Sequence, residues 1–258
     1  MATKFSIYIP SYGRHTNATT PSLLRICGIP FTLVVEPSEY EAYKKNFPYA
    51  KFLVLEQNEG GLAYSRRSIQ KYSESQGEEY HWQIDDDVMS FKIRRDGKNS
   101  PASATQVLNP IEDYVDQYQN IGLACPNHAF FAFSSKEDFS LNGSASNCVL
   151  IRNNTGNYFR LRAVMDKDLS MQILTSNYAT VRFNRLLFDC GYTGDSGGLA
   201  LNVYKDNGRA EAVLEFIEQW KQYEQYFKPS PKDPNRMAPS RIWSIFKQEL
   251  VLKDKSND

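Results

Sequence analysis

The sequence predicts an α/β fold with a mixed, mostly parallel sheet and a C-terminal helical extension. Short apolar runs alternate with helical patterns over the first hundred residues, as in strands joined by crossover helices. Polar or Pro-containing segments follow these runs, and such folds carry their functional loops at the carboxyl ends of the strands. The 258 residues suffice to bury a sizeable core, which excludes disordered and fibrous proteins.

The first two predicted strands both end at a proline. Residues 5–10 form an apolar run that ends at Pro10, and residues 32–37 form a second run of the same kind. Between them, residues 22–27 predict a short crossover helix, and residues 38–43 begin another helix after the second strand. This order is typical of parallel strand pairing.

Two further strands extend this pattern. Residues 51–55 form the third strand, and a helix is predicted over about residues 62–75. The fourth strand, residues 80–84, runs directly into Asp85-Asp86-Asp87. Right-handed crossovers would place these polar strand ends along one edge of the sheet.

The pattern is weaker after Met89. A polar loop is predicted over residues 94–104, a helix over 111–118, and short strands at 130–133 and 148–151.

Apolar side chains recur at helical spacing near the C-terminus, over residues 211–226 and 241–252. Four prolines between these segments argue against a regular element there. We therefore expect one main domain over residues 1–210 and a helical extension over residues 211–258.

Composition excludes several classes of protein. Lys and Arg number 30, as do Asp and Glu, which argues against a general binder of polyanions. The four cysteines are far apart and form no C-x-x-C pair, so we expect buried thiols in a reducing, cytoplasmic setting rather than a disulfide framework or a zinc site. No stretch has the length or apolarity of a membrane span or secretion signal, and no obligatory protein partner is indicated.

The triplet Asp85-Asp86-Asp87 is the most informative segment. Adjacent carboxylates repel one another unless a cation holds them, and Asp85 and Asp87 would lie on the same side of an extended chain. Hard divalent cations such as Mg²⁺ and Mn²⁺ take carboxylate ligands and leave positions for substrate phosphates. A solvated acidic turn or a helix cap is the alternative.

A second polar segment, Asn58-Glu59-Gly60-Gly61, precedes Arg66 by one to two helical turns. Two glycines permit close backbone approach, and an arginine beside a helix start offers charge to a phosphate. A plain turn is the alternative. The sequence lacks a Walker lysine motif and a G-x-G-x-x-G motif.

Together these segments resemble a GT-A glycosyltransferase, whose fold is a Rossmann-like nucleotide-sugar binder, over about the first hundred residues. The resemblance implies a UDP-sugar donor, with residues 1–100 as the donor half and 101–210 as the acceptor half. It implies that Asp85 and Asp87 hold Mn²⁺ or Mg²⁺, and that Arg66 supports the leaving diphosphate. The donor-binding residues it implies are Pro10, Tyr12, Arg14, Glu36, Tyr40, Asn58, Gly61, Arg66, Asp85, Asp86, Gly198 and Lys205.

Residues 165–172 contain two carboxylates two positions apart, Asp166 and Asp168. They look like the acidic element that GT-A enzymes place near the acceptor, where a base takes the proton of the attacking hydroxyl. Acidic residues that favour a helix N-terminus are the alternative. The sequence leaves open which aspartate is the base and whether the anomeric carbon inverts.

Within this fold the chain is most similar to the TET-associated and base J-type DNA glucosyltransferases, through residues 34–40, the Asp triplet and residues 166–172. It departs from them at Asp166 and at Arg67. The resemblance implies transfer of glucose to the hydroxymethyl group of a modified pyrimidine in DNA, a bacteriophage-type modification in the host cytoplasm.

Two arginine pairs, Arg94 with Arg95 and Arg160 with Arg162, are candidates for nucleic-acid contact. A solvated charged face is the alternative for each pair. The other functions to consider are a glycosyltransferase for a glycan, lipid or protein acceptor, a nucleotidyltransferase, and a non-enzymatic module that binds nucleic acid.

Overall fold

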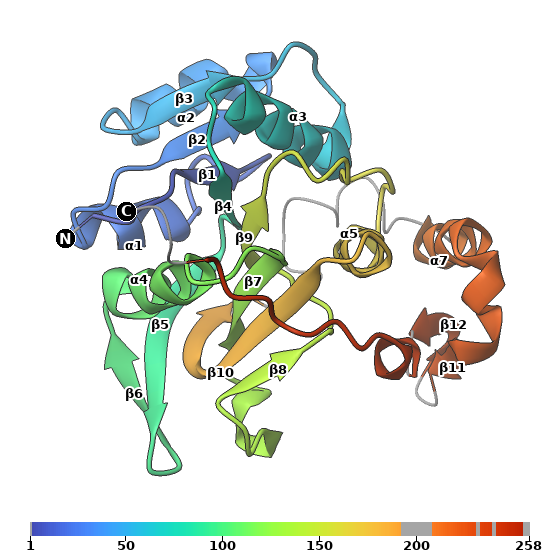
Figure 1. Ribbon diagram of the computed structural model, residues 1–258. Coiled ribbons are helices and arrows are strands. Elements are labelled where there is room, and N and C mark those ends of the chain that lie inside the picture. Colours follow the sequence, from blue (N-terminus) through green and yellow to red (C-terminus); the bar gives the residue numbers. More distant parts are fainter. Residues whose placement is uncertain (1, 192–207, 231–232, 239–240, 255–258) are drawn as a thin grey trace.

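The computed structural model describes residues 2–191, 208–230, 233–238 and 241–254, and its centre is one ten-stranded mixed sheet (Figure 1). Four strands form its N-terminal part and pair in parallel in the order β3-β2-β1-β4. They are β1 (Ile7–Pro10), β2 (Thr32–Val35), β3 (Lys51–Val54) and β4 (Tyr80–Ile84). The helices that join them are α1 (Thr20–Ile26), α2 (Tyr40–Asn46) and α3 (Gly61–Ser75).

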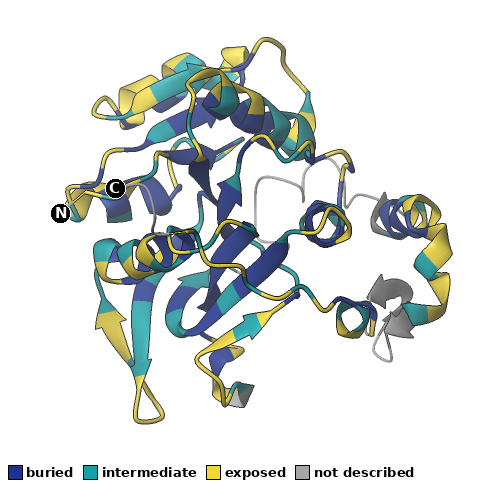
Figure 2. Cartoon of the chain, in the orientation of Figure 1, coloured by how far each residue is buried: buried dark blue, intermediate teal, exposed yellow. Residues whose placement is uncertain are grey.

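The inner strands of this part are buried throughout, as Figure 2 shows in dark blue. Helices on the sheet faces remove both sides of the strands from water, so β1 and β2 are apolar runs rather than alternating ones, and the polar His81 and Gln83 of β4 are buried as well. Strand β3 lies at the edge and is more exposed. Every strand and helix predicted up to residue 84 is confirmed within a few residues.

The remaining strands continue the sheet with mixed directions. Strand β7 runs parallel to β10, whereas the other pairings are antiparallel. The mixed α/β class is thus confirmed. Within the described sheet, only the first four strands are neighbours that all run parallel to one another. The further elements are β5 (Val88–Arg95), β6 (Lys98–Ala102), β7 (Ile121–His128), β8 (Phe139–Leu141), β9 (Cys148–Arg152), β10 (Ala179–Cys190), α4 (Ala104–Val115) and α5 (Met165–Thr175).

The prediction of a loop over residues 94–104 is wrong. This segment contains the end of β5 and all of β6, which form a hairpin closed at Arg95 and Lys98. Its turn is Asp96-Gly97, with φ of 49° and 77°. Two positive φ values in a two-residue turn match the right-handed twist of the strands, and Asp-Gly is a preferred sequence for such a turn.

Two other predictions between residues 104 and 133 are corrected. Helix α4 begins at Ala104, well before residue 111, because Ser103 and Gln106 form a capping box and Pro110 is accommodated inside the helix. Residues 130–133 are not a strand but a turn that leads into the short 3-10 helix η2 (Ala132–Ser134).

The C-terminal segment is only partly helical. Its elements are α7 (Gly208–Gln219), η3 (Lys221–Tyr226), the paired strands β11 (Lys228–Ser230) and β12 (Asp233–Ala238), and η4 (Ile242–Ile245). The proline-rich segment therefore does form a regular element, because prolines are tolerated in strands that lie at a sheet edge. The prediction of a helix over residues 241–252 is correct only for the short 3-10 helix η4, and residues 246–252 after it are not helical.

After η4 the chain runs as an extended strap across the molecule, drawn in red in Figure 1. It ends beside the loop between α4 and β7, where Gln119 N donates to Val251 O at 2.8 Å and Lys253 N donates to Gln117 O at 2.8 Å. The residues from α7 onward pack against α5 through an apolar cluster that includes Met171, Phe216 and Ile242. In the part of the chain that is described, no helix has the length and apolarity to cross a membrane.

Helix α5 lies very close to β7 because residue 122 has no side chain. A Cβ at Gly122 would lie 2.6 Å from Ile173 Cγ2 and 2.9 Å from Tyr178 Cβ, distances that packed atoms do not adopt. Glycine thus permits the approach that places the start of α5 near the end of β4.

Candidate active site

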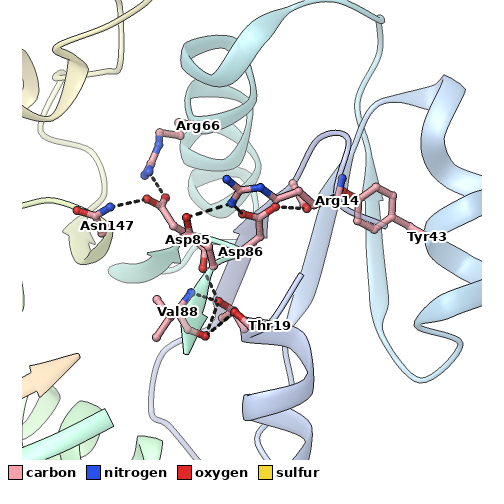
Figure 3. Close-up of polar contacts among 11 residues, drawn as sticks. Arg14, Thr19, Tyr43, Arg66, Asp85, Asp86, Val88 and Asn147 are labelled. Carbon is pink, nitrogen blue, oxygen red and sulfur yellow. Dashed lines mark hydrogen bonds and ion pairs between the residues drawn. The ribbon is translucent and has the colours of Figure 1, made fainter. Parts of the chain in front are cut away.

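The acidic triplet forms the turn between β4 and β5, and the start of α1 holds its backbone. The amides of Thr19 and Thr20 donate to the carbonyl oxygen of Asp86 at 2.9 and 3.1 Å. The Thr20 hydroxyl donates to the Asp85 carbonyl at 2.6 Å and accepts from the amide of Val88 at 2.9 Å. The triplet is therefore a fixed turn, and the alternative of a loose, solvated acidic turn does not describe it (Figure 3).

Asp86 points back toward the loop after β1. Arg14 Nη1 lies 2.6 Å from Asp86 Oδ1 and 3.1 Å from Asp87 Oδ2. Asp86 also accepts a hydrogen bond from Ser11, whose hydroxyl is 2.6 Å from the Tyr43 hydroxyl. Asp86 is 7% exposed, so it anchors this loop, and Arg14 bridges two acids of the triplet.

Asp85 forms an ion pair with Arg66 of α3, and its other oxygen accepts from Asn147 Nδ2 at 2.9 Å (Figure 3). Arg66 is 1% exposed, and its guanidinium lies 5.1 Å from the ring centroid of Phe159. Burial raises the pKa of Asp85 to about 7 against the opposing charge of Arg66, and Asp87 and Asp166 raise the pKa further. Three acids thus share one electrostatic environment around a buried arginine.

Asp166 lies in the first turn of α5. Burial raises its pKa, while the charges of Arg66 and Lys167 oppose this shift. Its Oδ1 atom is buried and has no hydrogen-bond partner among the described residues. Val164, which precedes the helix, has φ of 56°. Such a value is a genuine outlier for a β-branched residue and is most often retained at functional sites.

Asp168 is fully buried, and both of its carboxylate oxygens are hydrogen-bonded. It accepts from Arg160 Nε at 3.0 Å, from Gln172 Nε2 at 2.8 Å and from Trp220 Nε1 at 2.8 Å. These contacts join α5 to the segment after α7. The two aspartates that the sequence left equivalent therefore have different environments, and the one with an unpaired oxygen is Asp166.

Glu36 shapes the glycine-containing loop that begins α3. Its carboxylate accepts from the amides of Glu59 at 2.8 Å and Gly60 at 3.2 Å, while Asn58 Oδ1 accepts from the amide of Ser38 at 2.9 Å. Gly61 has φ of 73°, which favours glycine. The loop is thus held against the end of β2.

The other residues predicted to bind the donor lie in the same region. Pro10 is the last residue of β1, Tyr12 is half-buried in the loop that follows, and Tyr40 packs edge-on against Phe52 at 5.3 Å. Gly198 and Lys205 lie outside the described residues.

The four arginines predicted to contact nucleic acid have different surroundings. Arg160 is bound to Asp168, and Arg162 forms ion pairs with Glu211 and Glu215. Arg94 and Arg95 lie at the outer end of the β5–β6 hairpin. Charge compensation by nearby acids is thus a feature of Arg160 and Arg162.

Several residues of the site were not found from the sequence. Asn147 lies in an irregular loop 62 positions from its partner Asp85, and Glu39 accepts from the amide of Gly13 at 2.9 Å. Ser11, Thr20 and Tyr43 were missed as well, because single serines, threonines and tyrosines carry no spacing signal.

The carboxylates of Asp85 and Asp87 are of the type that binds a divalent cation with few protein ligands. Asp87 Oδ1 is buried and lacks a hydrogen-bond partner in the described part of the chain, and hard cations prefer carboxylate oxygens. Over the same residues, no cluster of three or more His, Cys, Asp or Glu side chains has the grouping of a complete metal site. Mg²⁺ is commonly held by one or two carboxylates together with substrate phosphates. Among the described residues, Asp87 has an unpaired oxygen for such an ion, and Asp85, whose oxygens contact Arg66 and Asn147, is the neighbouring carboxylate.

The buried His81 on β4, below this site, makes folding stability depend on pH. Burial lowers its pKa to about 3, whereas an unfolded histidine titrates near 6.5. As the pH falls below 6.5, the unfolded chain takes up a proton that the folded chain refuses, so stability decreases down to about pH 3. We expect His81 to cost about 2 kcal/mol of unfolding free energy at pH 5 relative to pH 7.

Urea unfolding at both pH values checks this expectation, with His81→Gln as the control that keeps a polar side chain beside Gln83. The variant should lose about 2 kcal/mol less than the parent between pH 7 and pH 5. Equal losses in the two proteins would contradict the assignment to His81.

Comparisons with known proteins address the same region. A family model described as TET-Associated Glycosyltransferase matches residues 5–198, a range that contains β1 to β10, the Asp85–Asp87 turn, Asp166 and Asp168. The crystal structure of A197 from STIV is similar to this chain at 12% sequence identity, covering 74% of this chain and 86% of that chain with a TM-score of 0.42. No curated protein matches the chain.

Proposed function

Since the chain belongs to the TET-associated glycosyltransferase family, we propose that it transfers a sugar, most simply glucose, from a UDP-sugar to the hydroxymethyl group of a modified pyrimidine in DNA. The family membership makes the chain a glycosyltransferase, and a nucleotide-sugar donor follows from that class of enzyme. UDP-glucose, a divalent metal and the DNA acceptor are parts of the proposal. The four cysteines are free thiols, which supports a reducing compartment such as the cytoplasm of a bacteriophage host.

One observation carries the proposal: an aspartate with an unpaired oxygen, Asp166, lies in the same electrostatic environment as Arg66 and the Asp85–Asp87 turn. Sugar transfer needs a base for the incoming hydroxyl and positive charge for the outgoing diphosphate. Both kinds of group meet at the carboxyl end of β4, at the edge of the sheet where α/β folds bind their ligands.

On the donor side, the loops after β1 and β2 would surround the nucleoside, with Tyr12, Tyr40 and the Glu36-held loop as its walls. Arg66 would stabilise the charge that develops on the leaving diphosphate, and Arg14 would hold Asp86 and Asp87 in position for it. A Mn²⁺ or Mg²⁺ ion held by Asp87 and Asp85 would supply further positive charge to the same diphosphate. Gly198 and Lys205 complete the proposed donor site.

On the acceptor side, Asp166 would take the proton from the hydroxymethyl group while the oxygen of that group bonds to the anomeric carbon of the donor sugar. The proton moves to Asp166 while the bond between that carbon and the diphosphate breaks. A direct displacement of this kind inverts the anomeric carbon. Asp168, whose oxygens are all engaged, would hold α5 in place.

Mass spectrometry of nucleosides tests the whole proposal. DNA with hydroxymethylcytosine or hydroxymethyluracil is incubated with the full chain, Mn²⁺ and a panel of UDP-sugars. We expect a mass gain of one sugar with the parent protein, none with Asp87→Ala, and an unchanged gain with Asp113→Ala, an exposed acid on α4 that serves as control.

Each of the other possible results would contradict a different part of the proposed function. Hydrolysis of the donor without a DNA adduct would contradict the DNA acceptor and favour a glycan, lipid or protein. Release of pyrophosphate would indicate a nucleotidyltransferase. A folded protein that consumes none of the UDP-sugars would contradict the proposed donor, and full activity in Asp87→Ala would contradict the metal ligand.

A further inference from the structure

Three phenylalanines are exposed within one four-residue turn after β7. Phe130, Phe131 and Phe133 have exposed fractions of 73%, 61% and 66%. Single exposed apolar residues are ordinary, but a contiguous aromatic patch on a protein surface usually marks a binding site. The three rings therefore indicate a binding surface.

The turn is held in this conformation by its backbone. The amide of Phe131 donates to the carbonyl of His128 at 2.9 Å, and the amide of Phe130 donates to His128 Nδ1 at 3.1 Å. Between the exposed rings, Ala132 is fully buried and packs with Ala129 and Leu187. The small residue is thus buried while the large rings on either side of it are held outward.

Positive charge lies directly beside the rings. The guanidinium of Arg94 lies 4.5 Å from the ring centroid of Phe133, and Arg94 is part of the hairpin end that also carries Arg95 and Lys98. In the described part of the chain, none of these three cations forms an ion pair with an acidic side chain. By contrast, the nearby Asp189 and Asp138 are each paired with a basic residue, Lys92 and Arg185 respectively.

Strand pairing brings the hairpin and the turn together. Phe188 of β10 pairs with Phe91 of β5 on one side and with His128 of β7 on the other. The cationic hairpin and the aromatic turn therefore flank the same stretch of β10. Rings that can stack on bases, next to cations that can meet phosphates, match the chemistry of nucleic acid better than that of an acidic or apolar protein surface.

We propose that Phe130, Phe131, Phe133 and Arg94 form a nucleic-acid docking surface, called here the aromatic platform, which binds the DNA acceptor away from the reacting base. This inference rests on the proposed DNA acceptor. Arg94 lies six positions along β5 from Val88, which is next to the acidic turn, and six steps along a strand correspond to about 20 Å. At 3.4 Å per base step, the platform would contact DNA about six base pairs from the modified base.

Fluorescence anisotropy with a labelled hydroxymethylated duplex tests the platform separately from chemistry. The triple variant F130A/F131A/F133A should bind this DNA at least about tenfold more weakly than the parent, and Arg94→Gln should reduce the salt dependence of log Kd by about one unit. Hydrolysis of UDP-sugar without DNA should be unchanged in both variants. Ile26→Ala and Leu214→Ala, which truncate exposed apolar residues elsewhere (84% and 63% exposed), should bind as the parent does.

Other outcomes overturn the inference in distinguishable ways. Unchanged DNA affinity in the triple variant would refute the aromatic platform, and a change in its oligomeric state at that unchanged affinity would assign the rings to self-association instead. If the parent protein hydrolyses UDP-sugar but binds no DNA, the proposed acceptor fails and the platform fails with it.

Discussion

Replacing Asp166 with asparagine is expected to lower kcat for sugar transfer by about 10²- to 10⁴-fold. The amide keeps the shape of the side chain but cannot accept the hydroxyl proton. Because Oδ1 of Asp166 has no hydrogen-bond partner among the described residues, the substitution breaks no contact at that atom, and the protein should fold normally. Steady-state kinetics together with circular dichroism of the purified variant check both parts of this expectation.

Asp168→Asn is the matched control, since it makes the same chemical change two residues along the same helix. It removes a negative charge that binds Arg160, so its main effect should be a lower Tm with most of kcat retained in the folded protein. If Asp168→Asn abolished transfer and Asp166→Asn did not, the assignment of the base would be reversed. Full activity in both variants would contradict a base on α5 and favour a retaining reaction.

Arg66→Met is expected to lower the free energy of unfolding by about 3–5 kcal/mol. Methionine fills much of the same volume, but it leaves the carboxylate of Asp85 partly buried without its cation, with Asp87 and Asp166 nearby. The cost arises from that uncompensated charge rather than from lost packing. Equilibrium unfolding in urea measures it.

Arg162→Met provides the comparison, because Arg162 also forms ion pairs, with Glu211 and Glu215, but its side chain is 53% exposed. Exposed ion pairs contribute little, so this variant should change stability by less than about 1 kcal/mol. The double variant Arg66→Met/Asp85→Asn should recover part of the loss, since it removes both charges. Equal costs for Arg66→Met and Arg162→Met would show that burial of the Arg66–Asp85 pair carries no penalty.

The N-terminal part of the fold could be predicted because its signals are local. Each of the first three strands is an apolar run with a clear end, the fourth ends at the acidic triplet, and each helix has its own start and stop residues. The β5–β6 hairpin also had a local signal, Asp96-Gly97, but the charged residues around it resemble a loop. Pro110 hid the true start of α4, because prolines usually mark helix boundaries.

The site could be predicted only as far as residue type and strand position allow. Asp85 and Asp87 follow from their place at the end of β4, and Arg66 follows from its place in the second turn of α3. Asn147 does not, because a tertiary contact alone brings it to Asp85. Asp166 and Asp168 are indistinguishable in the sequence, and they differ only in what surrounds them, which depends on Trp220 more than fifty positions away.

The extended strap has a consequence for the order in which the protein folds during synthesis. Most of its hydrogen bonds join residues 248–253 to Asn142 and to the loop between α4 and β7, partners that precede them by 106 to 137 positions. Contacts over such separations close long loops and form late. The strap must therefore leave the ribosome before the region around the end of α4 and the start of β7 is complete, and until then this region is open to chaperones and to association with other nascent chains.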